Sequence, residues 1–301
     1  MNRTLLAHLP IVLAVHRSGG FSAAANALDM SASAVSHAVQ SAEAQLGEPL
    51  FARTTRSVRP TEAGAAFLAA LGPALDEIDV AIDALGAARG RVGGTLRINA
   101  PRIAMPVAVT PLLAELARRH PALTVEVTCD DGLIDIVAEG YDAGIRLGHT
   151  VAQDMVAVRL TPPLKAILVA SPAYLAARGE PRSLAELAAH NCIGYRFVTS
   201  GAVYDWDLRE RGRHVSLAVN GTVRVTDSLH AKELALAGVG IAYLFEPLVR
   251  AELRSGALRQ LLPRSAFEEP GLSLYFPRRT ARAPKLRAFI DLAREMFDRA
   301  R

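Results

Sequence analysis

Short apolar stripes at helical spacing, separated by tight breaks, fill the first 64 residues of the chain. An apolar run at 5–15 predicts one helix, and two Ala-rich stripes after it predict two more, which meet at the break 28–31. Ser31 can accept a backbone hydrogen bond and begin the second Ala-rich helix. Because each Ala-rich stripe keeps its apolar residues on one face, we expect these two helices to cross over a small shared core.

The second Ala-rich helix is expected to present polar side chains on its outer face. Val35, Val39 and Ala42 share its inner face, so the opposite face is left for side chains that can reach base edges or phosphates. Two short helices with a tight break and a polar outer face are typical of a helix-turn-helix whose second helix reads DNA; the alternative is an ordinary Ala-rich helical pair. The residues expected to contact DNA here are Ser31, Ala32, Ser33, Ser36, His37 and Gln40.

A basic segment follows this helix. Gly47 is expected to end the helix, and residues 48–51 turn into a short strand. Arg and Thr side chains come next, in a pattern that favours a wing flanking a DNA backbone. Thr61 then caps a further helix. The wing residues expected to contact DNA are Arg53, Thr55 and Arg56.

In this order and spacing, the motifs resemble the winged helix-turn-helix of LysR-type transcriptional regulators. The resemblance implies a homodimer, or a homotetramer, that binds double-stranded operator or promoter DNA, with RNA polymerase as a further candidate partner. The reading helix departs from the family's usual Gln-Pro at Ala32-Ser33 and from its usual Arg at His37, which leaves the base preference open. The matching motifs are AAxxL at 24–28, SxSAVSxxV at 31–39, LGxPLFxR at 46–53 and TxAG at 61–64.

Residues 62 to about 88 predict one long helix with a narrow apolar stripe. Gly72 and Pro73 lie within it and favour a kink. The stripe has the alternating three- and four-residue steps of a coiled coil, which favours pairing with a second chain over packing on the helix's own domain; the resemblance likewise implies a linker helix that pairs two subunits. Residues 87–94 are typical of a hinge. The stripe consists of Leu68, Leu71, Leu75, Ile78, Ile82 and Leu85.

Strands and helices alternate beyond residue 93. Strands at 95–99, 123–128 and 142–146, with helices at 106–119 and 134–139 between them, predict a mostly parallel sheet with helices on both faces. The remaining expected elements are a strand at 166–170, a short helix at 183–188, a hairpin at 203–208 and 215–219, a helix at 228–237 capped by Asp227, strands at 240–245 and 272–276, and a closing helix at 284–297.

Two segments of this part resemble the effector domain of LysR-type regulators, namely 135–148 (DIVAEGYDAGIRLG) and 237–244 (AGVGIAYL). The resemblance implies a fold similar to type II periplasmic solute-binding proteins, with two α/β lobes, two crossover strands and a cleft. The expected fold class is therefore α/β with an α-rich N-terminal head. The expected domains are the winged helix-turn-helix at 1–61, the linker helix and hinge at 62–92, and the effector-binding domain at 93–301, with lobe I at about 93–161 and 267–301 and lobe II at about 162–266.

A small-molecule effector is expected in the cleft between the lobes, where strand ends and helix N-termini converge and favour an anion. We expect a polar or aromatic molecule with a carboxylate. Arg146 could instead pair with Asp142 or another carboxylate, and Asp227 could serve as a helix cap rather than a ligand. The candidate contacts are Ala100, Pro101, Arg102, Asp130, Arg146 and Gly148 from lobe I, and Phe197, Thr199, Ser200, Thr226, Asp227 and Ser228 from lobe II.

Composition and charge refine this interpretation only slightly. A chain of 301 residues with 50% hydrophobic and 21% charged residues is typical of a globular protein. Its net charge of +4 is mild, so affinity for DNA must come from where the basic residues lie. His8 and Pro10 interrupt the run at 5–15, which therefore predicts a first helix rather than a signal peptide. No apolar stretch has transmembrane length, and we expect a cytoplasmic protein without membrane contact.

The sequence shows little that would support catalysis or a bound cofactor. The eight His are scattered, so we expect no metal and no cofactor. Cys129 and Cys192 lie far apart, and buried structural thiols are favoured over a peroxide-sensing pair. An enzyme on the same scaffold would need a convergent acid, base or nucleophile set, and an exported solute-binding protein would lack the DNA-binding head. We therefore expect a regulator and not an enzyme.

Overall fold

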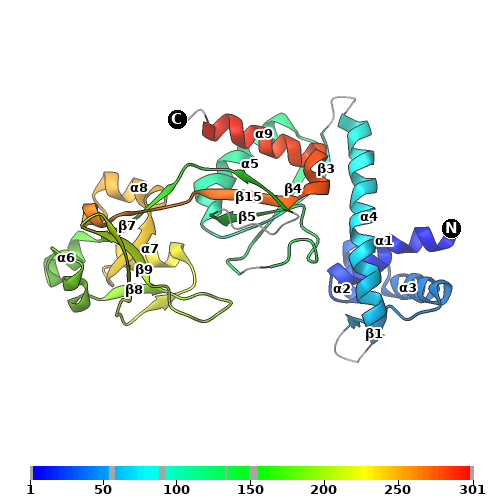
Figure 1. The fold of residues 1–301 in the computed structure, drawn as a ribbon, viewed down its shortest axis with the longest axis horizontal. Helices are drawn as coiled ribbons and strands as arrows, with labels where there is room; N and C mark the ends of the chain where they lie inside the picture. Colours follow the sequence, from blue (N-terminus) through cyan, green and yellow to red (C-terminus); the bar gives the residue numbers. More distant parts are fainter. Residues whose placement is uncertain (1–2, 54–57, 88–91, 133, 149–154, 299–301) are drawn as a thin grey trace.

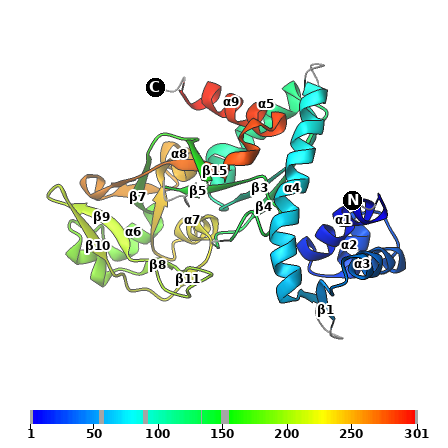
Figure 2. The ribbon, with the colours of Figure 1, turned by 45° about the vertical axis from the view of Figure 1, so that its right-hand side comes forward.

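The computed structural model describes residues 3–53, 58–87, 92–132, 134–148 and 155–298. The chain forms a helical head, one long helix and two α/β lobes (Figure 1). The long helix, α4 (Glu62–Ala87), stands between the head and the nearer lobe in both views (Figures 1 and 2).

The head has the predicted helix-turn-helix and wing. Ser31 Oγ accepts a hydrogen bond from the amide of Ala34 (3.2 Å), so the predicted cap begins the second helix of the motif. Gly47 ends that helix with a φ of 73°, a left-handed conformation that glycine adopts without strain. The elements are α1 (Arg3–Arg17), α2 (Phe21–Ala27), α3 (Ala32–Leu46), β1 (Phe51–Arg53) and β2 (Val58–Pro60), with β1 and β2 antiparallel.

The apolar stripe of α4 divides into two halves, which corrects the prediction of one continuous seam. Leu68 and Leu71 are only 3% and 6% exposed because they pack into the core of their own head against α1 and α3. Ile78, Ile82 and Leu85 are 54%, 60% and 71% exposed. Only the C-terminal half of the stripe is therefore open to another chain. The helix itself continues through Gly72 and Pro73 without interruption.

Lobe I contains a mixed sheet with the strand order β4-β3-β5-β15-β6. Its β3 is parallel to β4 and β5, whereas β15, from near the end of the chain, is antiparallel to β5 and β6. An apolar core joins α5 and α9 to one face of this sheet. The elements are β3 (Gly94–Ala100), a π-helical turn (Met105–Val109), α5 (Thr110–Arg119), β4 (Leu123–Cys129), β5 (Ala143–Leu147), β6 (Met155–Arg159), β15 (Leu272–Pro277), the 3₁₀ helix η4 (Arg278–Arg282) and α9 (Pro284–Asp298).

The opposite face of this sheet is polar, because Asn99 and Arg146 alternate with the core residues of their strands. The helix expected at 134–139 is wrong: the described chain there forms turns, with one helical hydrogen bond from the Glu139 amide to the Asp135 carbonyl (3.0 Å). A run this short gains little from helix propagation, so contacts with the rest of the lobe decide its shape.

Lobe II contains a sheet with the strand order β11-β8-β12-β7-β13, and β14 also pairs with β7. The predicted hairpin forms as β9 and β10, and the predicted short helix is a 3₁₀ helix. Asp227 caps α7 as predicted, since its Oδ1 accepts from the Leu229 amide (2.8 Å). The elements are β7 (Leu164–Ala170), α6 (Pro172–Arg178), the 3₁₀ helix (Ala185–Ala189), β8 (Cys192–Tyr195), β9 (Trp206–Glu210), β10 (Arg213–Leu217), β11 (Arg224–Val225), α7 (Ser228–Leu236), β12 (Ile241–Phe245), α8 (Glu246–Ser255), β13 (Arg259–Leu261), a 3₁₀ turn (Pro263–Ser265) and β14 (Phe267–Glu269).

The two segments that connect the lobes lie against each other. Thr161 Oγ1 accepts from the Leu272 amide (2.9 Å), and a Cβ at Gly271 would lie 2.2 Å from the carbonyl oxygen of Pro162. Only glycine fits this close approach of two backbones. The pair of crossing segments therefore joins the lobes at a fixed point.

Candidate DNA-reading surface and lobe junction

The polar residues predicted to read DNA lie along the outer side of α3. Its buried residues face the head core, whereas Ser33, His37 and Gln40 are exposed and Ser36 is half-buried. Ser31 and Ala32, at the start of the helix, are also exposed, and the hydroxyls of Ser31 and Ser33 lie 3.0 Å apart. This side of α3 is free of the rest of the molecule (Figure 1).

The wing is only partly described. Arg53 ends β1 and is paired in register with Val58, so its backbone lies at the end of the strand pair away from the Phe51–Pro60 pair. Thr55 and Arg56 lie outside the described residues. Arg59, on β2, is exposed and adds a cation to the same strand pair.

Glu43 fixes the wing relative to α3, a role that the sequence did not indicate. Its Oε1 accepts from the amides of Leu50 (2.9 Å) and Phe51 (3.1 Å), which begin the wing. A carboxylate that accepts two backbone hydrogen bonds holds that backbone firmly. Seen in the sequence, Glu43 resembles any polar residue on the outer side of a helix.

The contact between the lobes, here called the lobe junction, is centred on Arg102. The Arg102 amide donates to Asp131 Oδ1 (2.9 Å), and its Nη1 lies 3.2 Å from Asp131 Oδ2. Its Nε lies 3.6 Å from Asp227 Oδ2, which belongs to lobe II. Arg102 is thus held between a carboxylate of each lobe. The predicted Asp130 instead accepts from the Gly132 amide (2.8 Å) and shapes the turn beside it.

Two further contacts cross the lobe junction. Burial, the negative charge of Asp131 and a hydrogen bond with Asp131 raise the pKa of Tyr195 to about 12. A Cβ at Gly132 would lie 3.3 Å from Thr199 Oγ1, so the turn of lobe I touches the Thr199 loop of lobe II. Asp131 and Tyr195 were missed by the sequence analysis, because it did not predict the strand that ends at Tyr195 and it selected Asp130 rather than the neighbouring Asp131.

Arg146 lies beneath the turn that carries Gly132. Its Nη2 donates to Asn99 Oδ1 (2.6 Å) and to the Gly132 carbonyl (2.7 Å), and its Nη1 donates to the Ile145 carbonyl (2.7 Å). Within the described residues Arg146 has no carboxylate partner. Its Nε and the Nδ2 of Asn99, a fully buried residue, are buried donors for which the described part of the chain offers no acceptor. The alternative pairing with Asp142 is wrong, because that carboxylate binds Lys285 (2.9 Å).

The remaining candidate residues are distributed more widely. Ala100 and Pro101 are buried. The Gly148 amide donates to the Gly271 carbonyl (3.2 Å), beside the segments that connect the lobes. Phe197 packs edge-on against aromatic rings of lobe II and is exposed. Ser200, next to Thr199, is exposed. Of the two residues that flank Asp227, Thr226 is exposed and Ser228 is half-buried.

In the part of the chain that the structure describes, no group of three or more His, Cys, Asp or Glu could hold a metal ion. None of the helices formed by these residues has the length and apolar character needed to cross a bilayer.

Comparison with known proteins agrees with this architecture. Residues 6–65 match the bacterial regulatory helix-turn-helix protein of the lysR family, and residues 89–298 match the LysR substrate binding domain. A putative transcriptional regulator of Pseudomonas aeruginosa is 39% identical, over 94% of this chain and 92% of its own length. The HTH-type transcriptional regulator PgrR of Escherichia coli is 35% identical, over 97% of each chain.

A solved structure of CrgA, a LysR-type transcriptional regulator from Neisseria meningitidis, has a TM-score of 0.61 and 28% identity, covering 96% of this chain and 98% of its own. The relatives are named as regulators of transcription, and the matching domains are a DNA-binding head and an effector-binding domain. The chain therefore belongs to the LysR family of DNA-binding transcriptional regulators and is not an enzyme.

Proposed function

We propose that this regulator reads its operator with the outer side of α3, while the wing positions it on the phosphates. Ser36 and Gln40 lie on that side at a spacing of about one helical turn, which suits side chains that enter a major groove. Hydroxyl and amide groups can discriminate base edges, whereas arginines at the wing contact phosphates without reading sequence. Arg53 is the wing cation closest to α3 in the chain.

A gel shift with the DNA upstream of the regulator's own gene tests this assignment. Gln40→Ala should reduce the preference for this DNA over random DNA, whereas Gln45→Ala, on the same helix but rotated away, should leave it unchanged. Arg53→Ala should weaken binding to both DNAs and lower the salt slope by about one unit. An unchanged salt slope in Arg53→Ala would contradict the wing assignment, and equal effects of the two glutamine variants would contradict the reading face.

We also propose that the protein works as a homodimer, paired through the exposed half of the α4 stripe, with a homotetramer as the larger assembly. Ile78, Ile82 and Leu85 form a row of large, exposed apolar side chains on the C-terminal half of α4. Exposed apolar rows at coiled-coil spacing are stabilised by a matching row on a second chain. Two reading helices are also what an operator with two half-sites requires.

The effector, on this proposal, is a small molecule with a carboxylate that binds at the lobe junction. The observation that carries this is the pair of buried donors, Arg146 Nε and Asn99 Nδ2, which have no acceptor among the described residues. Buried donors without partners are unfavourable, and an arginine without a carboxylate favours an anion. Arg102 lies near by on the same lobe, but carboxylates of the protein already neutralise it.

A thermal-shift screen of carboxylates, amines and neutral metabolites on the full-length protein tests the ligand class. A ligand at one hundred times its dissociation constant should add about 2.7 kcal/mol to the free energy of unfolding. Arg146→Gln should abolish the shift caused by a carboxylate, whereas Arg97→Gln, on a neighbouring strand and paired with Glu126, should retain it. Hits confined to amines, or a carboxylate hit unchanged in a folded Arg146→Gln, would contradict the anion assignment.

A further inference from the structure

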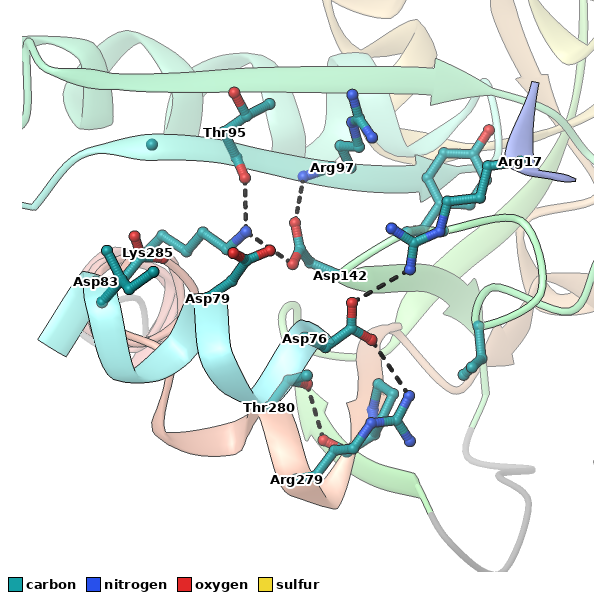
Figure 3. A pocket seen from close by; sticks show the side chains of 16 residues that line it. Arg17, Asp76, Asp79, Asp83, Thr95, Arg97, Asp142, Arg279, Thr280 and Lys285 are labelled. Atoms are coloured by element: carbon teal, nitrogen blue, oxygen red, sulfur yellow. Dashed lines mark hydrogen bonds and ion pairs between the residues drawn. The ribbon is translucent and has the colours of Figure 1, made fainter. Parts of the chain in front are cut away.

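A polar cavity of about 290 Å³ lies where the head, α4 and lobe I meet (Figure 3). Its lining comes from the end of α1, the middle of α4, the start of β3, the turn before β5, η4 and the start of α9. The carboxylates of Asp76, Asp79 and Asp83 line its α4 side, and cations from the head and lobe I face them (Figure 3). The cavity therefore has the head, the long helix and lobe I as its walls.

Asp76 of α4 joins these three parts directly. Its Oδ1 accepts from Arg17 Nη2 (3.2 Å), at the end of α1 in the head. Its Oδ2 lies 3.5 Å from Arg279 Nη2, in η4 of lobe I. The three side chains are 25%, 24% and 28% exposed, so the pairs are partly shielded from water. One carboxylate of the linker helix therefore holds a cation from the head and a cation from lobe I.

Lobe I also contacts the head next to the Asp76 carboxylate. Gly140, in the turn before β5, has a φ of 75°, and a Cβ there would lie 2.7 Å from both Cδ and Nε of Arg17. The turn and the Arg17 side chain are thus in contact with no room for a methyl group. The neighbouring Glu139 is close enough to oppose the lowering of the His16 pKa by burial and by Arg17.

The turn that touches Arg17 continues to the lobe junction. Residues 130–132 hold Arg102 through Asp131 and accept a hydrogen bond from Arg146 at Gly132. Further along the chain, the turns at 134–139 lead to Gly140, and β5 begins at Ala143. A single stretch between β4 and β5 therefore contacts the lobe junction at one end and the head at the other.

We propose that the two ion pairs of Asp76, with Arg17 and with Arg279, form an electrostatic clasp. Through this clasp, the position of the β4–β5 stretch determines how α1 packs in the head, and so the position of the reading helix α3. The α1 and α3 helices share the head core, so a shift of α1 changes the packing of α3 and the position of its DNA-reading side. The proposal deepens the effector control proposed above, but the mechanical link does not depend on which molecule binds.

Hydrogen exchange of the full-length protein, without DNA or ligand, tests the clasp. The readout is the amides of Ser18 and Gly19, which bond to carbonyls in the last turn of α1. Asp76→Asn and Arg279→Gln should each speed their exchange about two- to fivefold, the factor expected for a partly exposed ion pair. Asp79→Asn is the matched control, because it removes the same charge from the next turn of α4 and lines the same cavity.

Arg279 lies in the effector domain, and on this proposal it acts on the head through Asp76. Unchanged exchange at Ser18 and Gly19 in Arg279→Gln would overturn the proposal. Equal acceleration in Asp79→Asn would also overturn it, since the cause would then be net charge rather than pairing.

Gly140→Ala provides an independent variant that leaves every charge in place. Its methyl group should displace Arg17 and speed exchange at the end of α1. Gly256→Ala has nearly the same φ of 76° but open space around its Cβ, and should leave α1 unchanged. A Gly140→Ala variant with normal α1 exchange would overturn the contact between turn and head. Because the measurement uses no DNA and no effector, these results stand apart from success or failure of the gel shift and the ligand screen.

Discussion

Two glycines on α4 are predicted to respond in opposite ways to the same substitution. A Cβ at Gly64 would lie 1.9 Å from the Leu50 carbonyl oxygen and 2.8 Å from its carbonyl carbon. That carbonyl cannot move aside easily, because it accepts from the Thr61 amide (3.0 Å) while Glu43 holds the Leu50 amide. At Gly72 the nearest atom is 3.8 Å away, an ordinary contact with Leu13 Cδ1.

The magnitudes follow from these contacts. Replacing a helical glycine by alanine favours folding by about 1 kcal/mol in either position. Overpacking against a backbone that cannot yield costs about 1–3 kcal/mol, and the 1.9 Å approach at Gly64 belongs at the upper end. Gly64→Ala should therefore destabilise the head by about 2 kcal/mol and Gly72→Ala should stabilise it by about 1 kcal/mol. The two variants should differ by about 3 kcal/mol, more than a hundredfold in the equilibrium between folded and open head.

Hydrogen exchange of the α1 and α3 amides in the full-length protein is the suitable assay. Tryptophan fluorescence is unsuitable, because the one tryptophan of the chain, Trp206, is buried in lobe II and reports on the wrong part. Gly64→Ala should lower protection throughout the head, and Gly72→Ala should raise it. If both variants raised protection, the close approach of α4 to the wing backbone would be refuted, and with it our physical reason for glycine in the TxAG motif.

Three further changes have definite expected outcomes. Ser31→Ala removes the cap of α3 and should destabilise the head by about 1 kcal/mol, seen as faster exchange in α3; unchanged exchange would show that the cap contributes nothing. Ile78→Asp combined with Ile82→Asp should convert dimers to monomers in sedimentation, and a double variant that remains dimeric would refute the proposed pairing face. Burial raises the pKa of the Cys129 thiol, and raises that of Cys192 to about 12, so little thiolate is present at about pH 8. The expectation of a buried thiol holds for Cys192, whereas Cys129 is only half-buried. Iodoacetamide should label Cys192 far more slowly in the native than in the unfolded chain, and after Cys129, with faster labelling as the pH rises; rapid native labelling of Cys192 by mass spectrometry would contradict a buried structural thiol.

The sequence predicted best where one residue and its immediate neighbours decide the structure. Ser31, Gly47 and Asp227 begin or end helices as expected, because a cap bonds an amide only two or three positions away or adopts one special backbone conformation. The motif of the head and the alternation of strands and helices after residue 93 also follow from short periodicities.

The sequence did not predict features that depend on contacts between residues far apart in the chain. The stripe of α4 has one period from Leu68 to Leu85, but only tertiary packing decides that its first half is covered by the protein's own head. The turns at 134–139 have a helix-like pattern that contacts with other parts of the lobe override. Arg102 was predicted at the lobe junction, but its choice of Asp131 over Asp130 depends on the geometry of a turn 29 residues away.

The two arginines of the lobe junction differ in a way that bears on how a ligand signal would travel. Arg102 already bridges the lobes through carboxylates on both sides, so an anion there would have to displace a protein carboxylate. In the described ranges Arg146 has no carboxylate partner, and an anion that reaches its Nε would satisfy a buried donor without breaking an ion pair. Arg146 also holds the Gly132 carbonyl, at the start of the stretch that ends against Arg17. On the proposals made above, an anion at Arg146 would therefore act on the head by changing its hold on this stretch, while the bridge between the lobes stays closed.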